Sequence, residues 1–91
     1  MKTFKDLEFH FMDHTNGIQA IEFFENGYGV SCIKHDFSYG GKKGLYEIAV
    51  IKGNPKNWII TYDTPITDDV LGYLTKEDVS NVMEQVANLK E

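Results

Sequence analysis

Two Asn-Gly pairs, at residues 16–17 and 26–27, constrain the fold of this chain more than any other feature of its sequence. Both are flanked by apolar and aromatic residues, and Asn-Gly is the strongest short hairpin signal, because a type I′ turn needs positive φ at both central residues. Two further reversals follow, "SYGGKKG" at 38–44 and "GNPKN" at 53–57. Reversals this close together favour antiparallel neighbours, because a parallel pair needs a crossover of about a dozen residues or more.

Five candidate strands are separated by these reversals, over residues 4–13, 18–25, 28–36, 45–52 and 57–63. Apolar and polar side chains alternate in the first, which indicates one buried and one wetter face. The fourth, "LYEIAVIK", is almost continuously apolar, which is typical of a central strand covered on both faces. We therefore expect an antiparallel meander in the order of the sequence.

The hydrophobic period changes near the C-terminus, in "TKEDVSNVMEQVANLK". Its apolar residues fall on one helical stripe, with Thr75 placed to cap the first turn and Asp78 completing a short-armed capping box. We predict a helix over 76–90. Residues 64–74 are expected to connect sheet and helix, either as a short helical turn or as an extended edge segment ending at Gly72.

These elements predict an α+β fold in which a five-stranded antiparallel β-meander has the C-terminal α-helix packed on one face. With 91 residues, the chain is expected to form a single globular domain over residues 1–91. No apolar stretch is long enough to span a bilayer, and the N-terminus turns acidic before any apolar segment develops, so we expect neither a membrane anchor nor a signal peptide. The single cysteine, Cys32, cannot form an internal disulfide, which favours a reducing, cytoplasmic setting and a packed strand residue rather than a reactive thiol.

The net charge is −5, and the chain contains no arginine. Residues 1–33 carry −3, residues 34–56 carry +3 and residues 57–91 carry −5. An acidic chain without arginine is not expected to bind duplex DNA specifically. Most of the aromatic residues are assigned to the core rather than to a stacking platform for single-stranded nucleic acid, because the lysines form no continuous groove. Mimicry of nucleic-acid charge by the acidic C-terminal third is a further alternative.

The glycine-rich segment 38–44 is the first candidate site. It does not match a phosphate-binding P-loop, because its glycines are adjacent, no Ser or Thr follows Lys43, and a strand comes next. The simplest interpretation is a hairpin loop whose glycines allow positive φ, and a backbone nest that binds an anion with help from lysine is the alternative. Exposed loops on a rigid sheet often carry binding function, so we predict a partner-binding surface made of Tyr39, Gly40, Gly41, Lys42 and Lys43.

The acidic segment 63–69 is the second candidate contact surface, through Asp63, Asp68 and Asp69. Adjacent carboxylates such as Asp68 and Asp69 point in different directions, so they make a poor acid/base pair. His10 and His14 are four residues apart, which would place both on one face of a strand, and with Asp13 they suggest a metal-dependent hydrolase as a minor alternative. We expect no catalytic residue, no metal and no cofactor.

The runs "NGYGVSCIKHDFSYGGKKGLYEIAVIKG" and "YDTPITDDVLGYLTKEDV" resemble small accessory proteins encoded by bacteriophages and prophages. The likeness spans residues 4–80 and supplies no catalytic residues. It implies a short cytoplasmic protein, acting in an infected bacterium, that binds a host protein, and components of host defence are among the candidate partners. The expected function is therefore non-enzymatic inhibition or modulation of a host protein. Two alternatives stay open: a small-ligand or anion-binding module that uses the 38–44 loop, and a homodimer through the outer sheet face.

Overall fold

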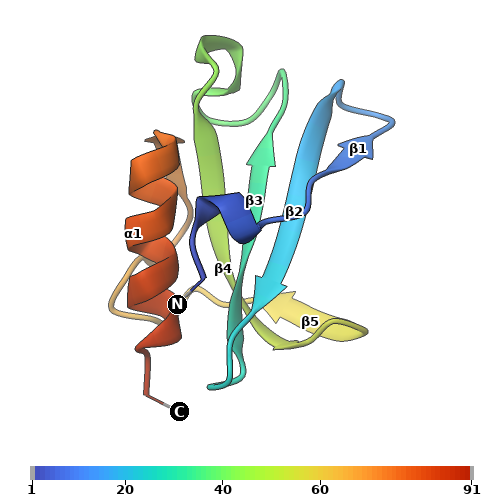
Figure 1. The fold of residues 1–91 in the computed structure, drawn as a ribbon. Helices are drawn as coiled ribbons and strands as arrows, with labels where there is room; N and C mark the ends of the chain where they lie inside the picture. The colour runs from blue at the N-terminus through green and yellow to red at the C-terminus, as the bar shows by residue number, and fades with distance from the viewer. Residues whose placement is uncertain (1, 91) are drawn as a thin grey trace.

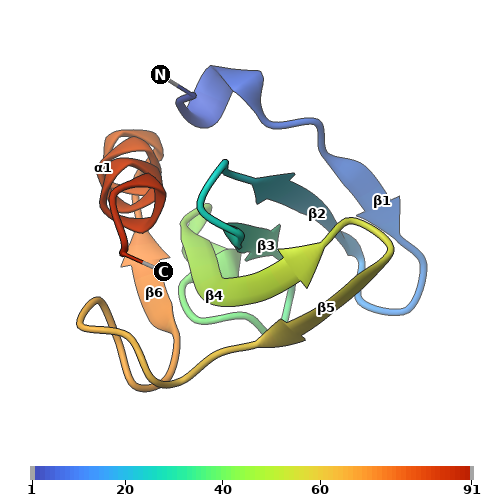
Figure 2. The ribbon, with the colours of Figure 1, turned by 90° about the horizontal axis from the view of Figure 1, so that it is seen from below.

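Strand β4 is the centre of the sheet in the computed structural model, which describes residues 2–90. The strands are β1 (His10–Met12), β2 (Gly17–Phe23), β3 (Tyr28–Lys34), β4 (Tyr46–Asn54), β5 (Asn57–Ile60) and β6 (Leu71–Leu74). All pairs are antiparallel, and the order β1-β2-β3-β4-β5 is the predicted meander. The sheet curls strongly, so that β1 and β5 swing away from the helix (Figure 2).

Helix α1 (Lys76–Ala87) covers one face of the sheet and runs beside β4 and β3 (Figure 1). Its buried residues Val79, Val82, Met83 and Val86 pack on Ala20, Val30, Cys32, Ile48 and Val50 to form the core. The predicted α+β fold is confirmed. No helix within residues 2–90 is long and apolar enough to cross a membrane.

The predicted cap of the helix is also confirmed. The backbone N–H of Asp78 donates to Thr75 Oγ1 at 3.1 Å, and the backbone N–H of Thr75 donates to Asp78 Oδ2 at 3.0 Å. The helix ends three residues earlier than predicted, with Asn88 as its C-cap.

Cys32 lies in this core and is fully buried, as expected for a packed strand residue. Burial raises the pKa of the Cys32 thiol to about 12. The thiol is therefore held in its neutral, unreactive form at physiological pH.

The first predicted strand, over 4–13, is largely wrong, because only His10–Met12 is a strand. Phe4–Asp6 forms a 3-10 turn (η1), in which the N–H of Thr3 donates to Asp6 Oδ2 at 2.7 Å. The Phe4 ring packs against Tyr46 with centroids 5.0 Å apart, and the Phe4 N–H donates to Ser80 Oγ on the helix at 2.9 Å. These contacts bend the chain across the edge of the core, where a continuous strand would have paired with β2.

Neither Asn-Gly pair forms the predicted type I′ turn. In the first pair only Asn16 has positive φ (52°), and Gly17 already belongs to β2. In the second pair only Gly27 has positive φ (84°), and the Gly27 N–H donates to the Phe24 carbonyl at 3.2 Å. This second reversal is a three-residue loop that ends in a left-handed glycine, a common hairpin form. Both Asn-Gly pairs still reverse the chain. The predicted strand order is therefore correct, although the predicted turn type is wrong.

Residues 64–74 adopt the extended alternative in their second half. Leu71–Leu74 forms β6, which pairs with the first half of β4 at Ile48↔Leu71 and Tyr46↔Leu74. The strand continues past Gly72, where the predicted edge segment was to end. β6 is thus a sixth strand of the sheet. β5 and β6 lie on the same side of β4, where β6 pairs with the first half of β4 and β5 pairs with its second half.

Candidate functional site

The loop over residues 38–44 is the central part of the connection between β3 and β4, and it lies at one end of the sheet, at the top of Figure 1. Its centre is a short 3-10 turn (η2, Gly41–Lys43) between Gly40 and Gly44, whose φ angles are 88° and 79°. These are left-handed values, which glycine adopts without steric cost. A Cβ atom at Gly41 would collide with the carbonyl oxygen of His35. The glycines are therefore required by the course of the hairpin itself.

Most backbone amides of this loop are used to hold it closed. The N–H groups of Gly41, Lys43, Gly44 and Leu45 donate to carbonyls within residues 38–41, each at 3.0 Å. The N–H of Tyr39 donates to Glu47 Oε1 at 2.8 Å. An anion-binding nest needs several free amides that converge on one point. The engaged amides favour a rigid loop over an open nest.

Strand β6 supports the loop from the side. The N–H of Tyr73 donates to the Tyr39 carbonyl at 3.1 Å, and a Cβ atom at Gly40 would lie 2.9 Å from the Tyr73 Cα. Tyr73 has a φ of 56°, which is uncommon outside glycine and asparagine. The Tyr73 backbone is therefore in a strained conformation at the contact between the loop and β6.

Three aromatic side chains and two lysines are exposed on this end of the molecule. Phe37 is 81% exposed, while Tyr39 and Tyr73 are each 57% exposed. Lys43 Nζ lies 5.9 Å from the centre of the Tyr73 ring, within reach of a cation–π contact. We define the loop surface as Phe37, Tyr39, Lys42, Lys43 and Tyr73. Of the predicted contact residues, Tyr39, Lys42 and Lys43 belong to it directly, and Gly40 and Gly41 shape its backbone.

A shallow hollow of about 190 Å³ adjoins the loop surface. Its lining residues are Asp36, Ser38, Gly40, Lys42, Lys43 and Tyr73. The Ser38 hydroxyl is already bonded, because it accepts from the His35 N–H at 2.9 Å and donates to the His35 carbonyl at 3.0 Å. The two lysines are therefore the groups best able to attract an anion here, opposed by the Asp36 carboxylate.

The acidic segment is exposed, but it is not part of the loop surface. Asp63, Asp68 and Asp69 lie between β5 and β6. Because β6 runs antiparallel to β4, the residues that precede it lie toward the far end of β4 from the loop (Figure 1). The structure thus separates the two predicted contact surfaces.

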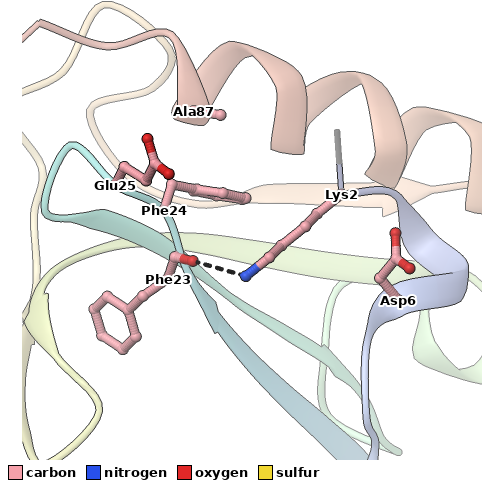
Figure 3. A pocket seen from close by; sticks show the side chains of 6 residues that line it. All are labelled: Lys2, Asp6, Phe23, Phe24, Glu25 and Ala87. Atoms are coloured by element: carbon pink, nitrogen blue, oxygen red, sulfur yellow. Dashed lines mark hydrogen bonds between the residues drawn. The ribbon is translucent and has the colours of Figure 1, made fainter.

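A larger groove of about 650 Å³ lies where the N-terminal segment, the β2–β3 hairpin and the end of α1 meet (Figure 3). It is lined by Lys2, Asp6, Phe23, Phe24, Glu25 and Ala87. Lys2 Nζ donates to the Phe23 carbonyl at 3.4 Å and pairs with Glu22 Oε2 at 2.7 Å. The lysine charge is thus already matched by a carboxylate.

Sequence reasoning missed Phe37 and Tyr73 as members of the loop surface, and it missed the groove entirely. Tyr73 follows Gly72, whose lack of a side chain leaves room for Tyr39, since a Cβ there would collide with the Tyr39 Cβ. That neighbouring glycine was the only local signal. The groove is built from three segments far apart in sequence, so it has no local signal at all.

His10, Asp13 and His14 are all exposed. The expectation that both histidines share a strand face is wrong, because β1 ends at Met12 and His14 lies in the following turn. Within residues 2–90, no three His, Cys, Asp or Glu side chains gather into a group that could hold a metal ion.

Comparison of the chain with protein-family models, with curated proteins and with solved structures finds no match.

Proposed function

We propose that this protein is a non-enzymatic binding protein and that its loop surface contacts the partner. The observation that carries the proposal is the exposure of Phe37 and Tyr39 on the β3–β4 connection and of Tyr73 on the adjoining strand β6. Most backbone amides of residues 38–44 are internally bonded, so this connection is held in place. Exposed aromatic residues commonly dominate interface energies. A backbone that is already fixed loses little conformational entropy on binding, so more of the contact energy becomes affinity.

The charge of the loop surface points to an acidic partner face. Lys42 and Lys43 lie in the only stretch with a positive balance, residues 34–56 at +3, in a chain whose net charge is −5. Opposite charges across an interface steer the encounter and select the partner. The acidic segment with Asp63, Asp68 and Asp69 offers a second, separate contact for a basic region.

The proposed partner is a bacterial host protein. The resemblance to phage-encoded accessory proteins supports this choice, together with a cytoplasmic site of action and an inhibitory or modulating role. Host-defence proteins belong to the candidate partners on the same ground.

Affinity capture from bacterial lysate tests the proposal with three baits: wild type, Tyr39→Ala/Tyr73→Ala, and Asp68→Asn/Asp69→Asn. We expect wild type to retain a host protein and the loop variant to lose it. The acidic-segment variant should still retain the same protein, though less of it than wild type, because it keeps the loop surface and loses only the second contact. Failure of wild type to retain any protein specifically, across several hosts, would contradict the proposal.

A small-anion module is the second candidate, supported by the hollow beside Lys42 and Lys43. Its volume of about 190 Å³ is below the range of about 300–1,000 Å³ usual for ligand pockets, so inorganic phosphate fits better than a nucleotide. Thermal unfolding with and without phosphate separates the candidates. Stabilisation of wild type but not of Lys42→Ala/Lys43→Ala would favour the anion module.

A further inference from the structure

The outer edge of β5 has unpaired backbone groups. β5 ends the strand order, and within residues 2–90 its only strand partner is β4. The Thr61 N–H donates to the Val50 carbonyl at 2.9 Å, and Ile51 is paired with Ile60. Because hydrogen-bonded and non-hydrogen-bonded pairs alternate along antiparallel strands, the backbone groups of Trp58 and Ile60 point away from β4.

The same edge lacks the features that normally keep edge strands apart. Residues 57–62, "NWIITY", contain neither a charge nor a proline. Ile59 is 67% exposed, Tyr62 is 54% exposed and Ile60 is 39% exposed. Figure 2 shows β5 at the open margin of the curled sheet. The edge therefore has free hydrogen-bonding groups and apolar side chains together.

The charges that flank the edge are of opposite sign. Lys56 precedes β5 and Asp63 follows it, and both are exposed. Antiparallel pairing of two copies brings the Lys56 end of each strand to the Asp63 end of the other. Parallel pairing would place like charges together, at an energetic cost. The edge is thus complementary to itself in one direction only.

We propose that two copies of this chain pair antiparallel along β5 and form one continuous sheet across a twofold axis. Centring the axis at Ile59 lets Trp58 of each copy exchange both backbone hydrogen bonds with Ile60 of the other. Ile59 then faces its own copy in a non-hydrogen-bonded pair, in which side chains approach most closely. An isologous contact of this kind closes after two copies.

The strand is short, so the dimer is expected to be weak and dependent on concentration. Sedimentation equilibrium of the full chain over a concentration series, up to the millimolar range, measures it. We expect the average mass of wild type to rise toward twice that of the chain. A wild-type protein that stays monomeric throughout overturns the proposal.

Charge substitution at Ile59 tests the position of the axis. Ile59→Lys and Ile59→Asp should each be monomeric, because identical charges meet across the axis, while an equal mixture of the two should dimerise again. Because the Ile59 side chain is largely exposed, its replacement should leave the core intact, and circular dichroism of each variant checks that it is folded. The matched control is Phe11→Lys, also 67% exposed but on the opposite edge strand β1, and it should dimerise as wild type does.

Recovery of the dimer only in the mixture supports pairing centred at Ile59. Dimers that persist in Ile59→Lys, or that disappear in Phe11→Lys, place the contact on another surface and overturn the proposal. Concentration-dependent slowing of amide exchange at Trp58 and Ile60, without change at residues of β1, is the independent result expected from the same geometry.

Discussion

The side-chain amide of Asn26 donates a 2.9 Å hydrogen bond to the backbone carbonyl of Val86, which joins the β2–β3 loop to the end of helix α1. The same nitrogen lies 3.2 Å from the Ala87 carbonyl and 2.9 Å from the Leu89 carbonyl. The last carbonyls of a helix have no partner within the helix. Asn26 therefore caps the helix from a distant part of the chain.

Substitution of Asn26 should lower stability in a graded way. Asn26→Ala removes the cap and should lower the free energy of unfolding by about 2 kcal/mol, since the Ala87 and Leu89 carbonyls lose the Asn26 donor and the Val86 carbonyl keeps only the Leu89 N–H. Asn26→Asp keeps the acceptor that receives the Tyr28 N–H, but adds a negative charge at the negative end of the helix dipole. It should therefore be less stable than Asn26→Ala. Urea unfolding measures both, and Asn81→Ala, at an exposed helix position, is the control.

Gly40 and Gly44 form a matched pair for testing how the loop rests on β6. Both have left-handed φ, so alanine at either should cost about 1 kcal/mol from backbone strain. A Cβ atom at Gly44 meets nothing within 4 Å, whereas at Gly40 it meets Tyr73 and Leu45 at 2.9 and 3.0 Å. Thermal unfolding should show Gly40→Ala to be clearly less stable than Gly44→Ala. Equal losses would mean that the contact between the loop and β6 contributes nothing.

Cys32 should not react with a water-soluble aromatic disulfide while the protein is folded. Its pKa is raised from 9.0 to about 12 by burial, which lowers the thiolate fraction by about a thousandfold in addition to blocking access. Labelling followed by absorbance should be slow in buffer and complete in denaturant. Fast labelling under native conditions would show that the sheet opens beneath the helix.

The capping carboxylate of Asp78 should make stability depend on pH in the acid range. Hydrogen bonds from the backbone and side chain of Thr75 lower its pKa below the ordinary 3.8. A lowered folded pKa gives stabilisation that is present above the unfolded pKa and is lost as the pH falls through the folded value. Unfolding free energies of Asp78→Asn should therefore fall less below about pH 4 than those of wild type. Identical slopes in the two proteins would contradict the cap.

Local signals explain which parts of the fold could be predicted. Strands β2 to β5 and the helix were placed to within a few residues, because alternation, turn residues and the Thr75 cap act over neighbouring positions. β6 was left open, since its pairing joins residues more than 20 positions apart in "LGYL" and "YEI". The strand expected over 4–13 failed because Asp6 caps a turn that directs Phe4 onto Tyr46 and the helix.

The candidate site was predicted in part for the same reason. Lys42, Lys43 and Tyr39 stand within one glycine-rich stretch, so the sequence displays them together. Tyr73 joins them through tertiary contacts between β6 and the loop, among them the hydrogen bond from its N–H to the Tyr39 carbonyl. Its left-handed backbone follows no residue preference, since tyrosine seldom adopts that conformation.

Calorimetric titration of the captured host protein, purified, against wild type and Tyr39→Ala/Tyr73→Ala tests the central claim most directly. If the loop surface is the contact, the double variant should bind at least about tenfold more weakly, because each anchor tyrosine commonly contributes more than 1 kcal/mol. Asp68→Asn/Asp69→Asn should change the affinity much less. Equal affinities of wild type and the loop variant would contradict the account.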